Sequence, residues 1–473
     1  LNFITFVKNY SVIKTDTIIA LATPPGIGAI SVIRLSGIDS IIISNKLFKA
    51  LNNLDLITQK THSINLGYIM DSKTIIDKVL ISVFKAPRSY TGENIVEISC
   101  HGSVFIQQKI LDLFTSNGCR LADPGEFTLR AFLNGKMDLS QAESVADLIS
   151  STSESSHKIA MDHMRGGFSE DIKLLREELL NFASLIELEL DFSEEDVEFA
   201  NMKAFEDLLV KIISTLKNLI DSFSLGNVIK DGIPISIVGE PNTGKSTLLN
   251  SILNEDKAIV SNIAGTTRDS IEDEIVINGI NFRFIDTAGI RTTEDEIESI
   301  GIRKTFENIN KSNIVLYVID SSKISSDSLD STKDKIDKLI STYSNKNILL
   351  IANKIDLGNL SFIEQEFSDY DLISISAKDN LNIDKVKTKI SSYIELGIVN
   401  NSSSVVTNSR HFSVLNNALT EVQNVYSGMK DGISSDLLAV DVRQALYHFG
   451  ELTGEITNDE LLGNIFSKFC IGK

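Results

Sequence analysis

The sequence predicts a multidomain α/β plus α protein: an α+β domain at the N-terminus, a helical domain split in two, and a P-loop α/β domain of the Ras-like type inserted between the helical parts. Three observations predict this fold class. Short apolar runs alternate with turns up to residue 125, helical spacing takes over at 126 and returns near the C-terminus, and a strand, a glycine-rich loop and a helix follow one another in between. The expected domains are residues 1–125, 126–228, 229–397 and 398–473.

The N-terminal region has the pattern of a compact α+β domain. After a loose extension at residues 1–15, three apolar runs predict strands. These runs are residues 29–35, 79–84 and 95–100. Residues 103–116 carry apolar side chains at helical spacing, and Asn117-Gly118 predicts the end of that helix.

Segments with apolar residues every three or four positions lie on both sides of the inserted domain. Before it, the predicted helices are residues 127–133, 140–149, 155 onward to Gly166-Gly167, and 174–190. After a Ser- and Asn-rich linker at 400–404, they are residues 412–426, 434–449 and 458–469. Helices this far apart in sequence still have to bury their apolar faces, so we expect both parts to form one helical domain.

The inserted domain is built around Gly239-Glu240-Pro241-Asn242-Thr243-Gly244-Lys245-Ser246, which follows an apolar run and opens onto a helix-like segment starting at Thr247. This context is the one that a phosphate-binding loop requires. Its glycines let backbone N–H groups surround a phosphate, and the helix N-terminus adds a positive end. We expect Lys245 to reach the β- and γ-phosphates and Ser246 to hold Mg²⁺. A chance glycine turn is the alternative, and the complete spacing argues against it.

Three further segments, each after an apolar run, identify the nucleotide. They are Asp286-Thr287-Ala288-Gly289, Asn353-Lys354-Ile355-Asp356 and Ser376-Ala377-Lys378. The first suits Mg²⁺ and a γ-phosphate. The carboxylate of Asp356 can accept hydrogen bonds from N1–H and the 2-amino group of guanine, which adenine does not offer. The third would close over the base. In this order the segments predict a GTP-binding domain.

Composition bounds the function further. A formal charge of −19 opposes indiscriminate binding to nucleic acid, so an RNA partner would need a local basic surface or a second protein. Three cysteines in a chain of 473 residues favour a reducing, cytoplasmic compartment. We expect no membrane association, because no apolar run is long enough to span a bilayer and the N-terminus lacks a signal-peptide pattern.

Several stretches outside the nucleotide motifs resemble one family along the whole chain, the tRNA-modification GTPases of the MnmE/TrmE type. In the N-terminal half they are Thr23-Pro24-Pro25-Gly26, Ile33-Arg34-Leu35-Ser36-Gly37, Ser89-Tyr90-Thr91-Gly92-Glu93, Pro124-Gly125-Glu126-Phe127, the run from Arg130 to Lys136, Asp138-Leu139 and Gln141-Ala142-Glu143. The last is the terminal Phe469-Cys470-Ile471-Gly472-Lys473. The chain departs from the pattern at Ile27, where relatives often carry a basic residue.

The resemblance implies a homodimer formed through the N-terminal domain, which would bind 5-formyl-tetrahydrofolate. It also implies an FAD-dependent partner protein of the MnmG type, in a heterotetramer or larger assembly, with which an aminomethyl-type group is placed on C5 of the wobble uridine of certain tRNAs. The folate-site positions that match the family are Arg34, Glu97, Lys136 and Lys473. Taken singly, Arg34 and Lys136 could be surface charges and Glu97 an outward-facing strand residue.

Hydrolysis must use a water-positioning group other than the Gln of Ras-type enzymes, because Ile290 stands at that position and cannot hydrogen-bond. The resemblance implies that Glu298 positions the water and that K⁺ stands where an arginine finger would. The K⁺ ligands would be Asn242 and carbonyl oxygens near Ser261, Ile263 and Thr266, within the nucleotide-binding segment Ser261-Asn262-Ile263-Ala264-Gly265-Thr266-Thr267. Thr267 would complete the Mg²⁺ shell. A solvated acidic run is the alternative for Glu298.

Two alternatives stay open. The chain could be a dimeric GTPase switch acting in ribosome assembly, with an N-terminal domain that serves only to dimerise; the folate-site residues and the terminal Cys-Ile-Gly-Lys separate the two readings. Cys470 could be a reactive nucleophile or a small residue near the folate, and we favour the second. Cys100 and Cys119 are expected in the core, and no metal other than Mg²⁺ and K⁺ is expected.

Overall fold

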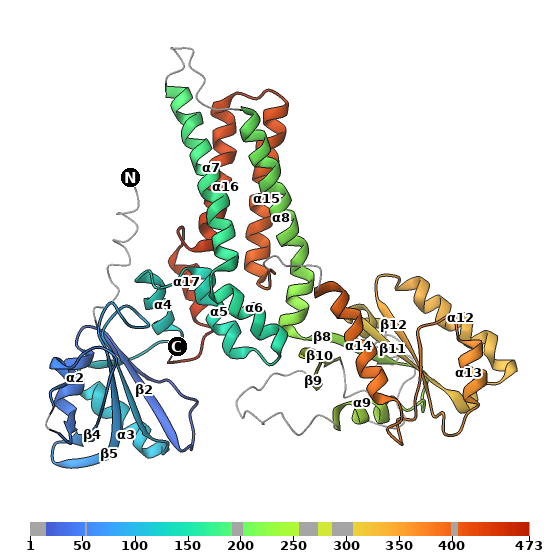
Figure 1. The fold of residues 1–473 in the computed structure, drawn as a ribbon, viewed down its shortest axis with the longest axis horizontal. Helices are drawn as coiled ribbons and strands as arrows, with labels where there is room; N and C mark the ends of the chain where they lie inside the picture. The colour runs from blue at the N-terminus through green and yellow to red at the C-terminus, as the bar shows by residue number, and fades with distance from the viewer. Residues whose placement is uncertain are drawn as a thin grey trace. The chain divides into compact units, whose positions relative to one another are not determined.

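The computed structural model describes residues 16–52, 54–191, 202–254, 273–285, 306–398 and 405–472 (Figure 1). The chain divides into two compact units. The first unit comprises residues 1–146, 164–177 and 446–473, and the second comprises residues 147–163 and 178–445. The four-part division expected from the sequence stays a prediction; its boundary at residue 228 falls inside a helix that ends at Asp231.

A seven-stranded sheet forms the body of the first unit, in the order β3-β4-β5-β6-β2-β1-β7. Its strands are β1 Thr17–Leu21, β2 Ile30–Ser36, β3 Phe48–Ala50, β4 Ser63–Asp71, β5 Thr74–Phe84, β6 Ile95–His101 and β7 Cys119–Leu121. All neighbours are antiparallel except β1 and β7. Helices α2 (Ser40–Leu47) and α3 (Val104–Ser116) bury apolar side chains against this sheet. The three predicted strands and the predicted helix are confirmed.

Strand β4 was missed by the sequence analysis because its inward-facing positions include polar and small residues. Asn65, Gly67 and Ile69 are its buried positions, so the apolar alternation that marks a strand is weak. Gly67 lies so close to the ring of Phe48 and the carbonyl of Lys49 that a Cβ atom would overlap them. The residue that looks like a strand breaker in the sequence is thus what allows β3 to pair with β4.

In the remainder of the first unit, α4 and the C-terminal segment pack against this sheet and against each other. Helix α4 (Glu126–Leu133) contributes Phe127, which packs with Ile18 and Ala20 of β1. Helix α17 (Asp459–Phe466) packs against α4 and against Leu139 at the start of α5. The residues after α17 then run to β1, where Gly472 is too close to the carbonyl of Leu21 to carry a side chain.

Long helices make up one part of the second unit. They are α5 (Leu139–Ser150), α6 (Glu154–Met164), α7 (Gly167–Asp191), α8 (Met202–Asp231), α15 (Ser409–Lys430) and α16 (Ser435–Thr453). Parts of α5, α7 and α16 and the last residue of α6 belong to the first unit. Helix α8 lies along α15 (Figure 1). The rings of Phe223 and Phe412 stack between the two helices, with centroids 4.3 Å apart. Helices from before and after the inserted α/β domain therefore share one core. No helix in the described part of the chain has the length and apolar character that crossing a membrane requires.

The inserted domain contains a six-stranded sheet in the order β13-β12-β11-β8-β10-β9. Its strands are β8 Ile233–Val238, β9 Asp273–Ile277, β10 Ile280–Phe284, β11 Ile314–Asp320, β12 Asn347–Asn353 and β13 Leu372–Ser374, all parallel except β9 with β10. Helices α9 (Lys245–Asn254) and α14 (Ile383–Ile398) pack in one apolar cluster, and α12 (Ser326–Thr342) and α13 (Leu360–Glu366) in another. The strands on which the nucleotide motifs were placed are confirmed.

The hairpin formed by β9 and β10 contacts the helical part of the second unit. Its turn residues, Asn278 and Gly279, both have left-handed backbone angles, as a tight hairpin turn requires. The Gly279 carbonyl accepts a hydrogen bond from the N–H of Ser155 in the first turn of α6, at 3.1 Å. This bond satisfies one of the N–H groups that a helix N-terminus leaves without a partner in the helix.

Candidate nucleotide-binding site

The predicted phosphate-binding loop connects β8 to α9, and two of its glycines are required by their surroundings. Gly239 has φ +149° and Gly244 has φ +95°. A Cβ atom at Gly239 would overlap the Val318 carbonyl, and one at Gly244 would overlap the side-chain amide of Asn353. Because they lack a Cβ atom, Gly239 and Gly244 can lie directly against Val318 and Asn353 of the neighbouring strands. The backbone can therefore approach a ligand closely, as phosphate binding demands.

Lys245, Ser246 and Thr247 form the first turn of α9, and the positive end of the helix dipole favours an anion there. The Lys245 ammonium donates to the carbonyls of Gly239 and Glu240 at 3.0 and 2.8 Å. Burial lowers the pKa of this lysine from its ordinary value. Because a partly buried ammonium lacks full hydration, a phosphate would be a better partner than the loop carbonyls.

The loop that starts with Asn353-Lys354-Ile355-Asp356 is called the base-recognition loop, after its predicted role. It is hydrogen-bonded to the phosphate-binding loop through Asn353. Its side-chain amide donates to the Thr243 carbonyl at 2.8 Å and accepts from the Ala377 N–H at 3.0 Å. Asn353 is buried, and one side chain thus joins three of the predicted segments. Lys354 adds a second link, since its ammonium donates to the Asn242 carbonyl at 2.7 Å.

Asp356 and Ser376 also lie together. The Ser376 hydroxyl is 2.8 Å from an oxygen of Asp356 and 2.8 Å from an oxygen of Asp379. A hydroxyl has one proton, so it donates to one of these carboxylates at a time. Lys378 is exposed beside them.

All of these loops follow the carboxyl ends of the parallel strands β8, β12 and β13, the edge at which open α/β sheets bind ligands. The structure therefore brings together the predicted residues Asn242 to Thr247, Asn353, Lys354, Asp356 and Ser376 to Lys378. Their roles remain predictions. Other predicted residues lie outside the described part of the chain: Ser261, Asn262, Ile263, Ala264, Gly265, Thr266, Thr267, Asp286, Thr287, Ala288, Gly289 and Glu298. Of the expected Mg²⁺ ligands only Ser246 is described, and its place in the first turn of α9 fits that role.

One residue of this edge was missed by the sequence analysis. Asp320 ends β11, is buried, and pairs with Lys354 at 2.7 Å. The signal was present, because Asp320 ends an apolar run as Asn353 ends another. Asp320 belongs to none of the nucleotide motifs, so the motifs do not predict it.

A second candidate site lies on the sheet of the first unit. Arg34 of β2 and Glu97 of β6 are direct cross-strand neighbours, and their side chains form an ion pair at 2.9 Å. The guanidinium lies 5.4 Å from the ring centroid of Tyr90 and 5.8 Å from that of Phe127. Both charged side chains keep part of their surface in solvent. The arrangement offers a cation, a carboxylate and two aromatic rings, a set suited to a flat heterocycle with an acidic tail.

The other predicted folate residues lie nearby or outside the described part. The Lys136 ammonium donates to the Pro87 carbonyl at 3.0 Å, in the segment that also carries Tyr90. Lys473 lies outside the described residues, but Gly472 lies against Leu21, next to the strand position that pairs with Arg34. The residues present therefore fit a folate, and their roles in binding it stay predictions.

The cysteines divide as expected from the sequence. Cys100 and Cys119 are buried, and desolvation raises the pKa of their thiols to about 11 and about 12. The burial of both side chains confirms their expected place in the core, and the raised pKa values favour the protonated thiols. Cys470 is exposed, and its carbonyl accepts from the Gly125 N–H at 3.4 Å. Within the described residues, no group of three or more His, Cys, Asp or Glu side chains could hold a metal ion.

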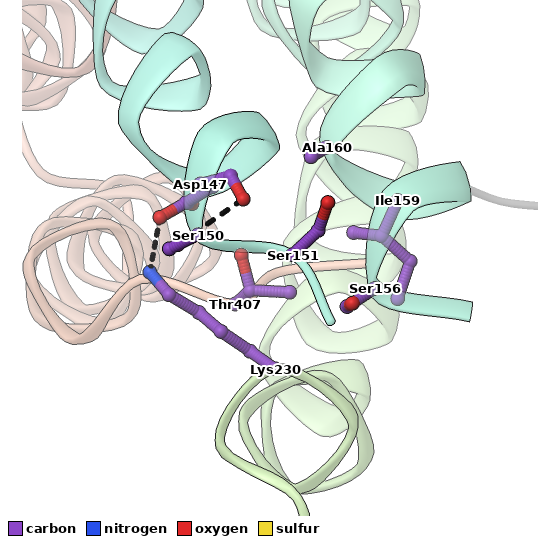
Figure 2. A pocket seen from close by; sticks show the side chains of 8 residues that line it. All are labelled: Asp147, Ser150, Ser151, Ser156, Ile159, Ala160, Lys230 and Thr407. Atoms are coloured by element: carbon purple, nitrogen blue, oxygen red, sulfur yellow. Dashed lines mark hydrogen bonds and ion pairs between the residues drawn. The ribbon is translucent and has the colours of Figure 1, made fainter. Parts of the chain in front are cut away.

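A small hollow in the helical part of the second unit is not a site of this kind. Figure 2 shows the ion pair between Asp147 of α5 and Lys230 of α8, at 2.7 Å, beside the hydroxyls of Ser150, Ser151 and Thr407. The hollow has room for about one water molecule. It is too small for a nucleotide or a folate.

Comparison with known proteins identifies the family of this chain. The family model of the MnmE helical domain matches residues 139–470, and that of the "GTP-binding protein TrmE N-terminus" matches residues 17–136. The chain belongs to the MnmE/TrmE family. A relative from Christiangramia forsetii, named tRNA modification GTPase MnmE, is 57% identical over 97% of this chain and 99% of its own length.

Relatives of the same name are similarly close in length. One from Flavobacterium johnsoniae is 56% identical over 98% of this chain and 100% of its own, and one from Bacteroides fragilis is 49% identical over 97% and 99%. Among solved structures, that of Era with MgGDPNP and part of 16S ribosomal RNA is 26% identical and covers 34% of this chain and 56% of its own, with a TM-score of 0.25. The family match extends across both the nucleotide site and the Arg34–Glu97 pair.

Proposed function

We propose that this protein binds and hydrolyses GTP and that the hydrolysis serves tRNA modification. One observation carries the proposal: in a chain that matches tRNA modification GTPases along its length, the phosphate-binding loop is joined by Asn353 and Lys354 to the loop that carries Asp356. Phosphate binding and base selection thus belong to one hydrogen-bonded unit.

The residues of the site divide the work as follows. The backbone of Thr243 and Gly244, the Lys245 ammonium and the first turn of α9 bind the phosphates. Asp356 selects guanine, supported by the Ser376 hydroxyl. Ser246 and Thr267 would hold Mg²⁺, which would neutralise phosphate charge. Glu298 orients the attacking water, since Ile290 cannot.

We further propose that K⁺ assists the reaction through Asn242 and carbonyl oxygens near Ser261, Ile263 and Thr266. A bound cation there would stabilise charge that develops on the phosphates, as an arginine finger does. Hydrolysis should then be faster in KCl than in NaCl of equal ionic strength. Equal rates in the two salts would remove the K⁺ site from the proposal.

The modification chemistry is proposed for the first unit. Arg34 and Glu97 would orient 5-formyl-tetrahydrofolate, Tyr90 and Phe127 would flank it, and Lys136 and Lys473 would receive its acidic tail. Bound folate would supply a one-carbon unit. With an FAD-dependent partner of the MnmG type, the homodimer would act on C5 of the wobble uridine of certain tRNAs in the cytoplasm. The alternative of a switch in ribosome assembly has no use for this set of side chains.

Two measurements test the proposal. Purified protein should bind GDP and GTP but not ADP or ATP in a fluorescence titration, because adenine cannot donate two hydrogen bonds to Asp356. Nucleoside analysis of tRNA from cells that lack the protein should show loss of a modified wobble uridine, restored by the parental gene. Normal tRNA together with a ribosome-assembly defect would favour the switch instead.

A further inference from the structure

We propose that Asp320 is a positioning residue of the nucleotide site: its carboxylate holds the Lys354 ammonium so that the base-recognition loop and the phosphate-binding loop keep one arrangement. The inference rests on the proposed binding of guanine nucleotides and extends it to a residue outside the nucleotide motifs. Asp320 acts through Lys354, and no direct contact with the ligand is implied.

The topology of the sheet gives Asp320 this place. Strand β11 pairs with β8 on one side and with β12 on the other, so it lies between the two strands that lead into the loops. Asp320 is its last residue and is the direct neighbour of Asn353 in the ladder. A side chain at the end of β11 can therefore serve both loops at once.

The Lys354 ammonium makes the connection. It donates to Asp320 Oδ2 at 2.7 Å and to the Asn242 carbonyl at 2.7 Å. Lys354 and Asn242 have φ angles of +64° and +62°. Residues other than glycine adopt this left-handed conformation at a cost, and they keep it only where their surroundings impose it. The hydrogen bond from Lys354 to Asn242 joins two such residues, one from each loop.

Asp320 is also held in place by bonds other than the one to Lys354. Its other oxygen, Oδ1, accepts from the N–H and the hydroxyl of Ser322, at 3.1 and 2.6 Å. Its side chain is 3% exposed, whereas that of Lys354 is 31% exposed. Burial alone would raise the pKa of Asp320, but the hydrogen bonds from Lys354 and Ser322 lower it below its ordinary value. An ionised, buried carboxylate of fixed orientation is a rigid anchor for a flexible lysine.

A purely structural role is the competing explanation, since the bonds to Ser322 also cap the short 3-10 helix at Ser321–Lys323. The two roles predict different results. If Asp320 positions Lys354, its loss should weaken the binding of guanine and hypoxanthine nucleotides equally. The two bases differ in the 2-amino group, which Asp356 reads and Asp320 does not. A structural role lowers stability without depending on Lys354.

The test uses the full-length protein and three variants, Asp320→Asn, Lys354→Met and the double variant, with Asp327→Asn in the exposed first turn of α12 as control. Affinities for GDP and IDP are measured by fluorescence titration, and steady-state GTP hydrolysis gives KM and kcat. Asp320→Asn should weaken the binding of both nucleotides by roughly tenfold, because a neutral amide oxygen holds an ammonium less strongly than a carboxylate does. KM should rise while kcat at saturating GTP stays near the parental value.

The double-mutant cycle decides between the roles. If Asp320 acts through Lys354, the double variant should bind GDP about as well as Lys354→Met alone. Additive losses in the double variant, parental affinity in Asp320→Asn, or a change in the ratio of GDP to IDP affinity would each overturn the proposal. If Asp320→Asn does not fold, Ser322→Ala loosens the same carboxylate without removing its charge and should give a smaller loss in the same direction. A parental protein that binds no guanine nucleotide would instead refute the nucleotide site itself.

Discussion

Asp356 is the residue on which the choice of nucleotide depends. Its carboxylate can accept from two donors of guanine, and the neighbouring Ser376 hydroxyl restrains it at 2.8 Å. Replacing Asp356 with Asn turns one acceptor into a donor, which suits the 2-oxo group of xanthine. Asp356→Asn should therefore prefer XDP over GDP by roughly tenfold or more in a competition titration, the size expected when buried polar groups are re-matched.

The exposed Asp369 in the same domain provides the control, since Asp369→Asn should keep the parental preference. An Asp356→Asn protein that still prefers GDP would show that another residue reads the base.

Arg34 tests the second site in the same way. Its guanidinium is bound to Glu97 and lies beside two aromatic rings, so removing it takes away a cation and leaves the carboxylate without its partner. Arg34→Ala should weaken 5-formyl-tetrahydrofolate binding by roughly tenfold to a hundredfold, in line with the loss of a charge-assisted hydrogen bond. GDP affinity should stay parental, because the nucleotide motifs lie in the second unit.

Isothermal titration with each ligand checks this prediction, and Lys73→Ala, in an exposed turn of the same sheet, is the control. Loss of both ligands together would mean that Arg34 has a structural role.

At the scale of elements, a cluster of charged side chains connects the residue before β1, the middle of β7 and helix α4. Arg130 is buried and bonds to Asp16, Glu93 and Glu126, and Arg120 bonds to Asp16 and Glu126. Burial alone would raise the pKa of Glu126, yet the hydrogen bonds from Arg120, the Asp123 N–H and Arg130 lower it overall. The pKa of Asp16 is lowered by the same arginines against its own desolvation.

The sign of the pH dependence follows from these directions. A carboxylate whose pKa is lower in the folded than in the unfolded protein stabilises the fold above its unfolded pKa, about 4. That stability is lost as the pH falls through the folded pKa. The Tm of the first unit should therefore fall steeply below about pH 4. Glu126→Gln should lower Tm at pH 7 and make the fall of Tm below pH 4 less steep. Calorimetry between pH 7 and pH 3 checks this, with the exposed Asp71→Asn as control; an equally steep fall of Tm in Glu126→Gln would contradict it.

How far the sequence predicts an element depends on what that element buries. Strand β8 is buried at all six positions and was found from its apolar run. Strand β1, with four buried positions out of five, was overlooked because its short run stands beside the extension and has no turn signal before it. The Asn278-Gly279 turn is readable in the sequence, but its bond to Ser155 is not, because nothing local encodes a contact between residues this far apart.

At the scale of the whole molecule, the nucleotide motifs predicted that their residues come together, and the family resemblance predicted that Arg34 and Glu97 belong to one site. Neither predicted the connections between them. Asn353 joins two loops 110 positions apart, and Lys354, which follows β12, binds Asp320 at the end of β11. Such contacts follow from the order of strands in the sheet, which a single sequence does not contain.

If GTP hydrolysis is coupled to tRNA modification as proposed, a change at the nucleotide must reach the helices, and the β9–β10 hairpin contacts them. In sequence it lies between the predicted segments at 261–267 and 286–298, and its turn bonds to the first turn of α6. A change at the γ-phosphate that moves either end of the hairpin would reach the helices through this contact. Hydrolysis, rather than binding alone, is then expected to drive modification.

Glu298 allows binding and hydrolysis to be separated. If it orients the attacking water, it acts in the transition state and contributes little to ground-state binding. Glu298→Ala should keep GTP affinity close to parental and lower kcat by roughly a hundredfold or more. Cells that carry only this variant should lose the modified wobble uridine, whereas Glu296→Ala, in the same acidic run, should behave as the parent. Parental hydrolysis by Glu298→Ala would mean that another residue replaces the missing Gln at Ile290. Lost hydrolysis with normal tRNA would mean that GTP turnover is not coupled to the chemistry, and the protein would then be a switch in which binding alone carries the signal.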